Sequence, residues 1–221
     1  QLPEYAAFLA TIQARVQKGF TRDDYLWVTD NARKRFRIIA NRVVDDAADI
    51  LMTITPAQLE ALQRQWDKVN RRFVREYRLE DSAEEQRQAR ARRLVSRIRE
   101  WVGNLNDEQE NRVIALANTN EVPLAFYRLR YEDRLRRQRE FLQLMAQRAD
   151  PARFPDRLRH WLLNWADGRN PEYDKLFQEW ERKQGDIYAA VDRMLTPQQR
   201  AAAVGRLQGF IDDFTELSKR P

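Results

Sequence analysis

Two stretches of the sequence carry arginines at intervals of three and four residues, the spacing that places side chains on one face of a helix. A guanidinium group can grip a carboxylate or a phosphate with two parallel hydrogen bonds. Such a face could therefore hold an acidic peptide segment, a lipid headgroup or a polyanionic glycan. The candidate partner-binding residues are Arg90, Arg93 and Arg97 in the first stretch and Arg134 and Arg137 in the second.

The same arginines have a simpler interpretation as a solvated helix surface. Glutamates lie within helical reach of them, including Glu84, Glu100, Glu132 and Glu140. Each exposed intrahelical ion pair contributes only about 0.3–0.5 kcal/mol. The sequence leaves both interpretations open, and partner binding by the five arginines is a hypothesis that needs a structure.

Side chains that could catalyse a reaction are scarce. The chain has no Cys and a single His, His160, which excludes disulfides and thiolate sites and leaves little for histidine acid–base or metal chemistry. No serine lies in a Gly-x-Ser-x-Gly sequence, and the glycines form no phosphate-binding loop. We therefore expect a protein that is not an enzyme and that holds no metal and no cofactor.

One acidic cluster, Asp45 with Asp46 and Asp49, could in principle bind a cation. It lacks the ordered ligand spacing and the turn glycine of a calcium loop, so we interpret it as the solvated end of a helix. The formal net charge is +6, but basic and acidic residues alternate along most of the chain. Nucleic acid is therefore not the expected partner.

Apolar residues recur at three- and four-residue steps over most of the 221 residues, which predicts helices. Helices are expected at about residues 3–18, from 21 onward, 55–78, 83–102, 106–118, 123–148, around 158–165, 172–194 and 196–218. No alternating strand pattern is found. We predict an all-α fold, an antiparallel bundle of eight or nine helices with no sheet. We treat residues 1–221 as one domain, and a division into two packed helical halves at about 1–120 and 121–221 is left open.

The sequence contains six tryptophans. Four of them fit apolar stripes and are predicted to lie in the core: Trp66, Trp101, Trp161 and Trp165. Trp27 and Trp180 fit less well and could line a cleft, and an aromatic cleft edged by arginine would suit a flexible peptide.

Three of the predicted helices begin with the same signature. A residue with a side-chain oxygen precedes the helix, and a Gln three positions later can reach back to its backbone amide, which is a capping box. The pairs are Thr55 with Gln58, Asn106 with Gln109, and Thr196 with Gln199.

These helix starts resemble the LTxxQ pattern of the periplasmic Spy and CpxP proteins, small helical proteins implicated in envelope stress and in holding unfolded chains. Further segments are LPEYAAFL at 2–9, ITPAQLEALQRQWDKVNRRFVREY at 54–77, RRLVSRIREWVGNLNDEQ at 92–109, YEDRLRRQREFL at 131–142 and LTPQQR at 195–200. Together they resemble a family of uncharacterised proteobacterial lipoproteins. The resemblance implies a periplasm-facing helical domain with an N-terminal lipid anchor upstream of this sequence, and it implies no established activity.

We expect from these observations the ectodomain of an envelope lipoprotein, located in the periplasm with its signal peptide removed. Its expected role is non-enzymatic, as a binding or chaperone-like module for a protein or an unfolded peptide client. The alternative is a cationic adaptor that binds nucleic acid or another polyanion through the arginine-rich helix faces.

Overall fold

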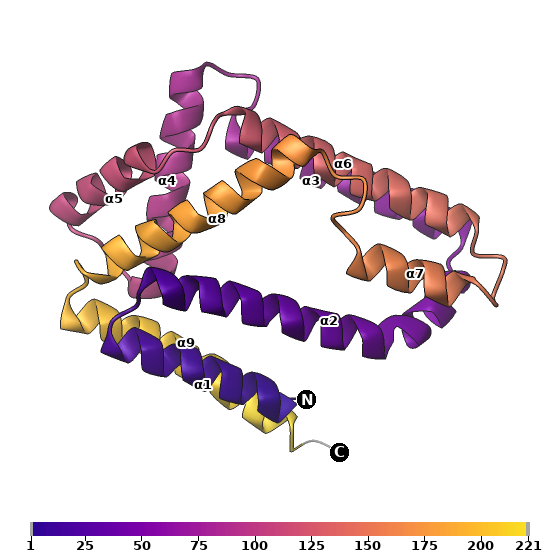
Figure 1. Cartoon of the computed structure of the whole chain (residues 1–221), viewed down its shortest axis with the longest axis horizontal. Coiled ribbons are helices and arrows are strands. Elements are labelled where there is room, and N and C mark those ends of the chain that lie inside the picture. The colour runs from indigo at the N-terminus through magenta and orange to yellow at the C-terminus, as the bar shows by residue number, and fades with distance from the viewer. Residues whose placement is uncertain (1, 220–221) are drawn as a thin grey trace. The chain divides into compact units, whose positions relative to one another are not determined.

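The structure is a computed structural model that describes residues 2–219, and over this range it contains helices and connecting turns without any strand (Figure 1). The prediction of an all-α fold with eight or nine helices is therefore confirmed. The nine helices of the described range are α1 (Leu2–Lys18), α2 (Arg22–Met52), α3 (Pro56–Tyr77), α4 (Ala83–Val102), α5 (Asp107–Thr119), α6 (Ala125–Ala146), α7 (Phe154–Leu163), α8 (Pro171–Asp192) and α9 (Pro197–Leu217).

The chain folds into two compact units, each assembled from segments that are distant in sequence. The first unit contains the residues up to 29, residues 87–122 and the residues from 178 onward. The second unit contains residues 30–86 and 123–177. Helices α2, α4 and α8 each contribute one part to each unit, so a unit boundary falls within each of these helices.

In the first unit, α1 and α9 lie side by side and antiparallel (Figure 1). The start of α1 is tied to the end of α9 by the stacked rings of Tyr5 and Phe214, whose centroids are 5.7 Å apart. At the other end, Arg200 donates a 2.5 Å hydrogen bond to the carbonyl oxygen of Val16. The core of this unit comprises Val95, Ile98, Val102, Leu105, Val113, Ile187, Val191 and Ala203.

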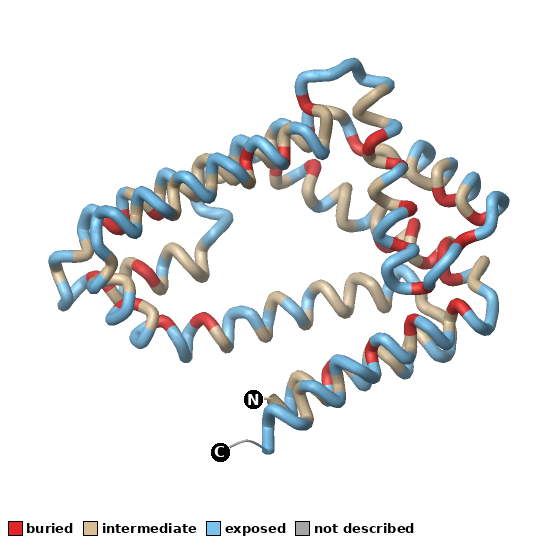
Figure 2. Tube along the Cα trace, turned by 180° about the vertical axis from the view of Figure 1, so that it is seen from behind, coloured by how far each residue is buried: buried red, intermediate tan, exposed pale blue. Residues whose placement is uncertain are grey.

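In the second unit, α3 and α6 form an antiparallel pair joined by aromatic contacts. Trp66 meets Phe141 edge-on at 5.7 Å, and Phe73 stacks on Tyr131 at 5.8 Å. Buried positions recur along the helices with exposed ones between them (Figure 2), as amphipathic helices require. The core of this unit comprises Val44, Ala48, Phe141, Leu144, Met145, Phe154 and Leu158.

The prediction that four tryptophans lie in the core is wrong for two of them. Trp101 is 40% exposed because it lies at the end of α4 and rests one face on α9, near Phe210 and Arg206. Trp165 is 44% exposed because α7 ends at Leu163, so the helical stripe that we extended to residue 165 stops before it. Trp66 and Trp161 are half-buried and pack against the core of the second unit.

Candidate binding groove

An open groove with a volume of about 370 Å³ lies entirely within the first unit. Its walls come from α1, the beginning of α2, α4, α8 and α9. Three polar residues, Arg97, Gln184 and Asp192, belong to the lining. The rest is apolar or aromatic and includes Leu9, Ile12, Tyr25, Val28, Trp101, Trp180, Tyr188 and Leu207. Ligand pockets of this size are commonly lined in this way, with few polar groups.

Two glycines bring the walls of the groove together. Gly19 joins α1 to α2 with φ at +108°, a conformation that an L side chain rarely adopts. Gly185 lets α2 approach α8, because a Cβ atom there would lie 3.1 Å from Cγ of Arg22 and 3.3 Å from Cδ1 of Tyr25. The close approach stacks Tyr25 on Tyr188, with ring centroids 5.4 Å apart. The absence of a side chain at Gly185 thus allows Tyr25 and Tyr188 to form one aromatic wall of the groove.

Exposed aromatic and cationic side chains gather around Trp101, which belongs to the groove lining. Trp101 and Phe210 are 40% and 41% exposed, and their ring centroids are 6.4 Å apart. The guanidinium of Arg206 lies 5.4 Å from the centre of the Trp101 ring and donates to the carbonyl oxygen of Glu100. Arg97 is exposed and lines the groove. These side chains can therefore contact both apolar and acidic groups of a partner.

The acidic residue of the lining, Asp192, is engaged within the unit. Arg200 donates to its Oδ1 at 2.6 Å and to its Oδ2 at 3.0 Å. The hydrogen bond to Asp192 is the main reason why the pKa of Arg200 is raised. The Asp192 carboxylate is 9% exposed, so its charge is balanced inside the unit and offers little to a ligand.

Of the predicted partner-binding arginines, three lie on α4 in the first unit. The Arg90 side chain is 11% exposed, forms an ion pair with Glu121, and donates to the carbonyl oxygen of Val122 at 3.3 Å. Arg87 pairs with the same carboxylate at 3.1 Å. Burial raises the pKa of Glu121, but the hydrogen bonds and charges of the two arginines outweigh it and the net pKa is lowered. Arg93 is half-buried, and Arg97 borders the groove.

The other two, Arg134 and Arg137, lie on α6 in the second unit. Arg134 Nε donates a 2.8 Å hydrogen bond to Oδ1 of the buried Asn70. Arg137 lies 4.1 Å from the centre of the Trp161 ring, donates to its carbonyl oxygen at 2.6 Å and pairs with Glu140 at 3.0 Å. Burial is the main reason why the pKa of Arg137 is lowered. Both side chains thus have close contacts within their own unit.

The capping signatures do more than start helices. Capping boxes are formed at Thr55, Asn106 and Thr196. In the first unit the carboxamides of Gln109 and Gln199 are buried and exchange two hydrogen bonds, each 2.9 Å long. Gln58, in the third copy, is exposed.

The sequence indicated the caps but not this pairing. The one available signal for the pairing is that Asn106 and Thr196 begin the same capping motif. Two copies of this motif can face each other and place their Gln side chains together. Because the pairing and further hydrogen bonds to backbone groups saturate both carboxamides, they are not available to bind a ligand.

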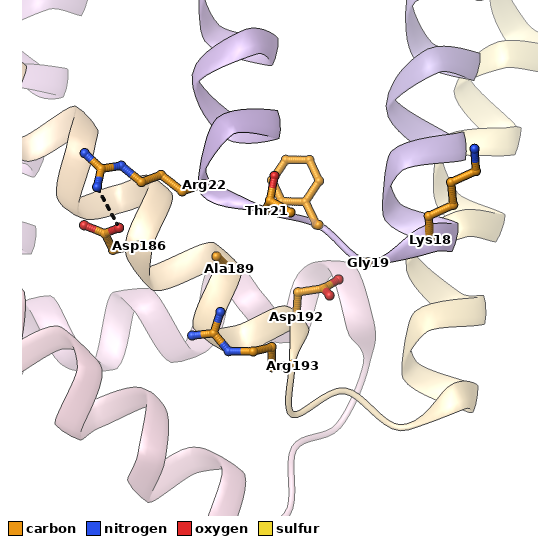
Figure 3. A pocket seen from close by; sticks show the side chains of 9 residues that line it. Lys18, Gly19, Thr21, Arg22, Asp186, Ala189, Asp192 and Arg193 are labelled. Carbon is orange, nitrogen blue, oxygen red and sulfur yellow. Dashed lines mark ion pairs between the residues drawn. The ribbon is translucent and has the colours of Figure 1, made fainter.

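A second hollow in the first unit lies at the turn between α1 and α2 and has a volume of about 470 Å³ (Figure 3). Arg22 pairs with Asp186 there at 3.4 Å, on the side away from Lys18. Asp192, the other carboxylate, is held by Arg200. The charged groups are therefore spread around the hollow and do not converge on one point.

The structure offers no metal site among residues 2–219, since no group of three or more His, Asp or Glu side chains there is suitably placed. Asp45, Asp46 and Asp49 are exposed near the end of α2, and Asp45 pairs with Arg159 at 2.9 Å. His160 is exposed, with Nε2 3.4 Å from the Asp167 carboxylate. None of the helices described over the same residues combines the length and the apolar character needed to span a membrane.

Comparison with known proteins gives one match. No curated protein matches the chain, and no solved structure does. A family model, that of a family of unknown function (DUF6279), matches residues 1–174, well over half of the chain. The chain therefore belongs to the DUF6279 family.

Proposed function

We propose that this protein is a non-enzymatic binding or chaperone-like module that holds apolar segments of unfolded protein chains in the groove of its first unit. The observation that carries the proposal is the groove itself, whose apolar lining includes Trp101, an exposed ring beside the exposed ring of Phe210. Exposed aromatic side chains of this kind are typical of protein-binding surfaces. Arg97 and Arg206 favour segments whose apolar residues are flanked by Asp or Glu.

The proposed setting is the periplasm, with the chain as the ectodomain of a proteobacterial envelope lipoprotein attached by an N-terminal lipid. Its support is the resemblance of the quoted segments to such lipoproteins and of the helix starts to Spy and CpxP. The test is the reading frame upstream of residue 1. A signal peptide with a lipobox Cys is expected, and a frame without one would remove the proposed location.

The alternative, a cationic adaptor for nucleic acid or another polyanion, has weaker support. Arg90, Arg134 and Arg137 are each engaged by carboxylates, carboxamides or carbonyl oxygens of their own unit. A polyanion would have to displace these contacts. Arg93 and Arg97 also interact with other residues of the chain, and the double variant described below tests them for either function.

Binding of a fluorescent peptide with an aromatic core flanked by Asp tests the groove, and fluorescence anisotropy gives its affinity. The groove variant is Trp101→Ala, whose side chain is exposed enough that truncation should spare the fold. Trp165→Ala is the matched control, because Trp165 is equally exposed but belongs to the second unit. Truncation of an aromatic side chain that anchors a partner costs about 2 kcal/mol, so we expect the groove variant to bind at least about tenfold more weakly.

The same measurement separates the two functions. A peptide with the same core but flanked by Lys, and a single-stranded oligonucleotide, are titrated in parallel at two ionic strengths. Polyanion binding falls steeply with salt, whereas capture of an apolar core depends on it much less. Oligonucleotide binding lost in an Arg93→Glu/Arg97→Glu variant but retained in Trp101→Ala would favour the adaptor. Equal affinities of the two Trp variants for the peptide would refute the proposal that the peptide binds in the groove.

A further inference from the structure

A second candidate site lies in the other unit, in a pocket of about 340 Å³ between α6 and α7. Its lining differs from that of the groove, because nearly all of its side chains are polar. It includes Arg137, Gln143 and Gln147 from α6, and Arg157 and Trp161 from α7. The pocket shares no residue with the groove, so it is independent of the function proposed above.

Two residues of the pocket lining, Trp161 and Arg157, carry hydrogen-bond donors without a partner among the described residues. The Nε1 atom of Trp161 is buried and makes no hydrogen bond. The indole N–H can only donate a hydrogen bond, so the free-energy cost of removing it from water is not compensated. Arg157 is half-buried, and no hydrogen bond or ion pair of its guanidinium to a described residue is found. An unpaired buried donor in a native fold calls for an explanation, and a bound acceptor is one.

The two carboxylates in the pocket lining, Glu140 and Asp167, both contact side chains other than Arg157. Glu140 receives a 2.5 Å hydrogen bond from Arg136 and a 3.0 Å hydrogen bond from Arg137. Asp167 is exposed at the rim and faces the His160 ring. Among the described residues, Arg157 therefore forms no ion pair with either carboxylate. A ligand group that pairs with the Arg157 guanidinium would carry a negative charge.

The Trp161 ring is firmly held. Arg137 lies against its face at 4.1 Å, and Phe141 packs on it with ring centroids 5.2 Å apart. These contacts fix the indole donor relative to Arg157, one helical turn away on α7. Residues four apart lie on one face of a helix, so Arg157 and Trp161 project from the same side of α7.

We infer that this pocket binds a small organic anion through a carboxylate or phosphate group, with Arg157 and Trp161 Nε1 as the donors. A guanidinium fork suits either group, and the carboxamides of Gln143 and Gln147 at the exposed wall can bind further oxygens. The anion can come from a soluble metabolite or from a lipid headgroup, and the experiment distinguishes these sources.

The experiment uses the full chain labelled with ¹⁵N and follows the indole N–H resonance of Trp161, which a Trp161→Phe variant assigns. Sodium phosphate and sodium citrate are titrated against sodium chloride at matched ionic strength. Vesicles of phosphatidylcholine with and without phosphatidylglycerol form the headgroup arm, measured by co-sedimentation. Arg157→Gln removes the charge, and Arg157→Lys keeps the charge but loses the fork. Arg139→Gln is the control, an exposed arginine on α6 outside the pocket.

We expect saturable binding of phosphate or citrate that moves the Trp161 resonance and is at least about tenfold weaker in Arg157→Gln. Arg157→Lys should fall between that variant and the parent, and Arg139→Gln should stay within about twofold of the parent. Binding only to phosphatidylglycerol vesicles, lost in Arg157→Gln, would identify the anion as a headgroup. The inference is overturned if no probe binds beyond the chloride control, or if Arg157→Gln and Arg139→Gln bind alike.

Discussion

The buried pairing of Gln109 with Gln199 makes the sharpest prediction about stability. The substitution Gln199→Met keeps an unbranched side chain of similar volume and removes its hydrogen bonds. Gln199 donates to Gln109 Oε1 at 2.9 Å and to the carbonyl oxygen of Asn104 at 2.8 Å. Its own Oε1 accepts from Gln109 Nε2 at 2.9 Å and from the Thr196 amide at 3.0 Å. The variant therefore loses all four of these bonds.

The size of the effect follows from those bonds. Each hydrogen bond in a protein contributes about 1 kcal/mol net, so we expect Gln199→Met to lower the free energy of unfolding by about 3–4 kcal/mol. Gln109→Met loses its bonds to Met194, to Asn106 and to Gln199, a similar cost. Two bonds are common to both variants. The double variant should therefore be about 2 kcal/mol less destabilised than the sum of the single ones.

Urea denaturation followed by far-ultraviolet circular dichroism measures these free energies. The control is Gln198→Met, because the neighbouring Gln198 is exposed in the same helix and its substitution should change stability by less than about 0.5 kcal/mol. If Gln199→Met cost no more than Gln198→Met, the pairing would not stabilise the first unit. If the double variant were strictly additive, the two side chains would not bond to each other.

Two further predictions concern the first unit. Because Arg90 and Arg87 lower the pKa of Glu121 below its unfolded value of 4.5, this pair stabilises the fold above that pH, and the benefit disappears as the pH falls through the folded pKa. The gap in denaturation midpoint between parent and Glu121→Gln should thus narrow in acid, and a constant gap would contradict this. Gly19→Ala should lower the thermal midpoint by a cost of about 1–2 kcal/mol, since φ is +108°, whereas Gly205→Ala, in open space on α9, should raise it. If both variants shifted the thermal midpoint equally and in the same direction, the argument from the backbone conformation of Gly19 would be refuted.

The helices were predictable because their signals are local. The stripe through Leu59, Leu62 and Trp66 and the caps at Thr55 and Thr196 depend only on residues within one or two turns. α3 begins at Pro56 and α9 at Pro197, next to those caps. Helix ends without such signals are predicted less accurately. The apolar stripe that we extended to Trp165 runs past the end of α7 at Leu163.

Contacts between distant segments could not be predicted in the same way. The spacing of Arg90 and Arg93 places them on one helix face but does not reveal that Glu121, 31 residues beyond Arg90, lies opposite it. Likewise Arg134 meets Asn70, which is 64 residues away in sequence. The spacing along the helix determines which arginines share a face. The residues that they contact depend on how the helices pack. The spacing of the arginines is therefore the same whether their helix face is solvated, paired within the fold or available to a ligand.

The two candidate sites differ in how they arise, and this decides which of them sequence analysis can find. The groove is a place where stripes from five helices converge without filling the space between them, and its aromatic residues look like core residues in the sequence. Trp180 stood out there because it fitted its stripe poorly, and it does line the groove. The anion pocket depends instead on a missing contact, the unpaired Nε1 of Trp161 beside Arg157. No local pattern encodes a missing contact, because it depends on where the acceptors of all the packed helices come to lie.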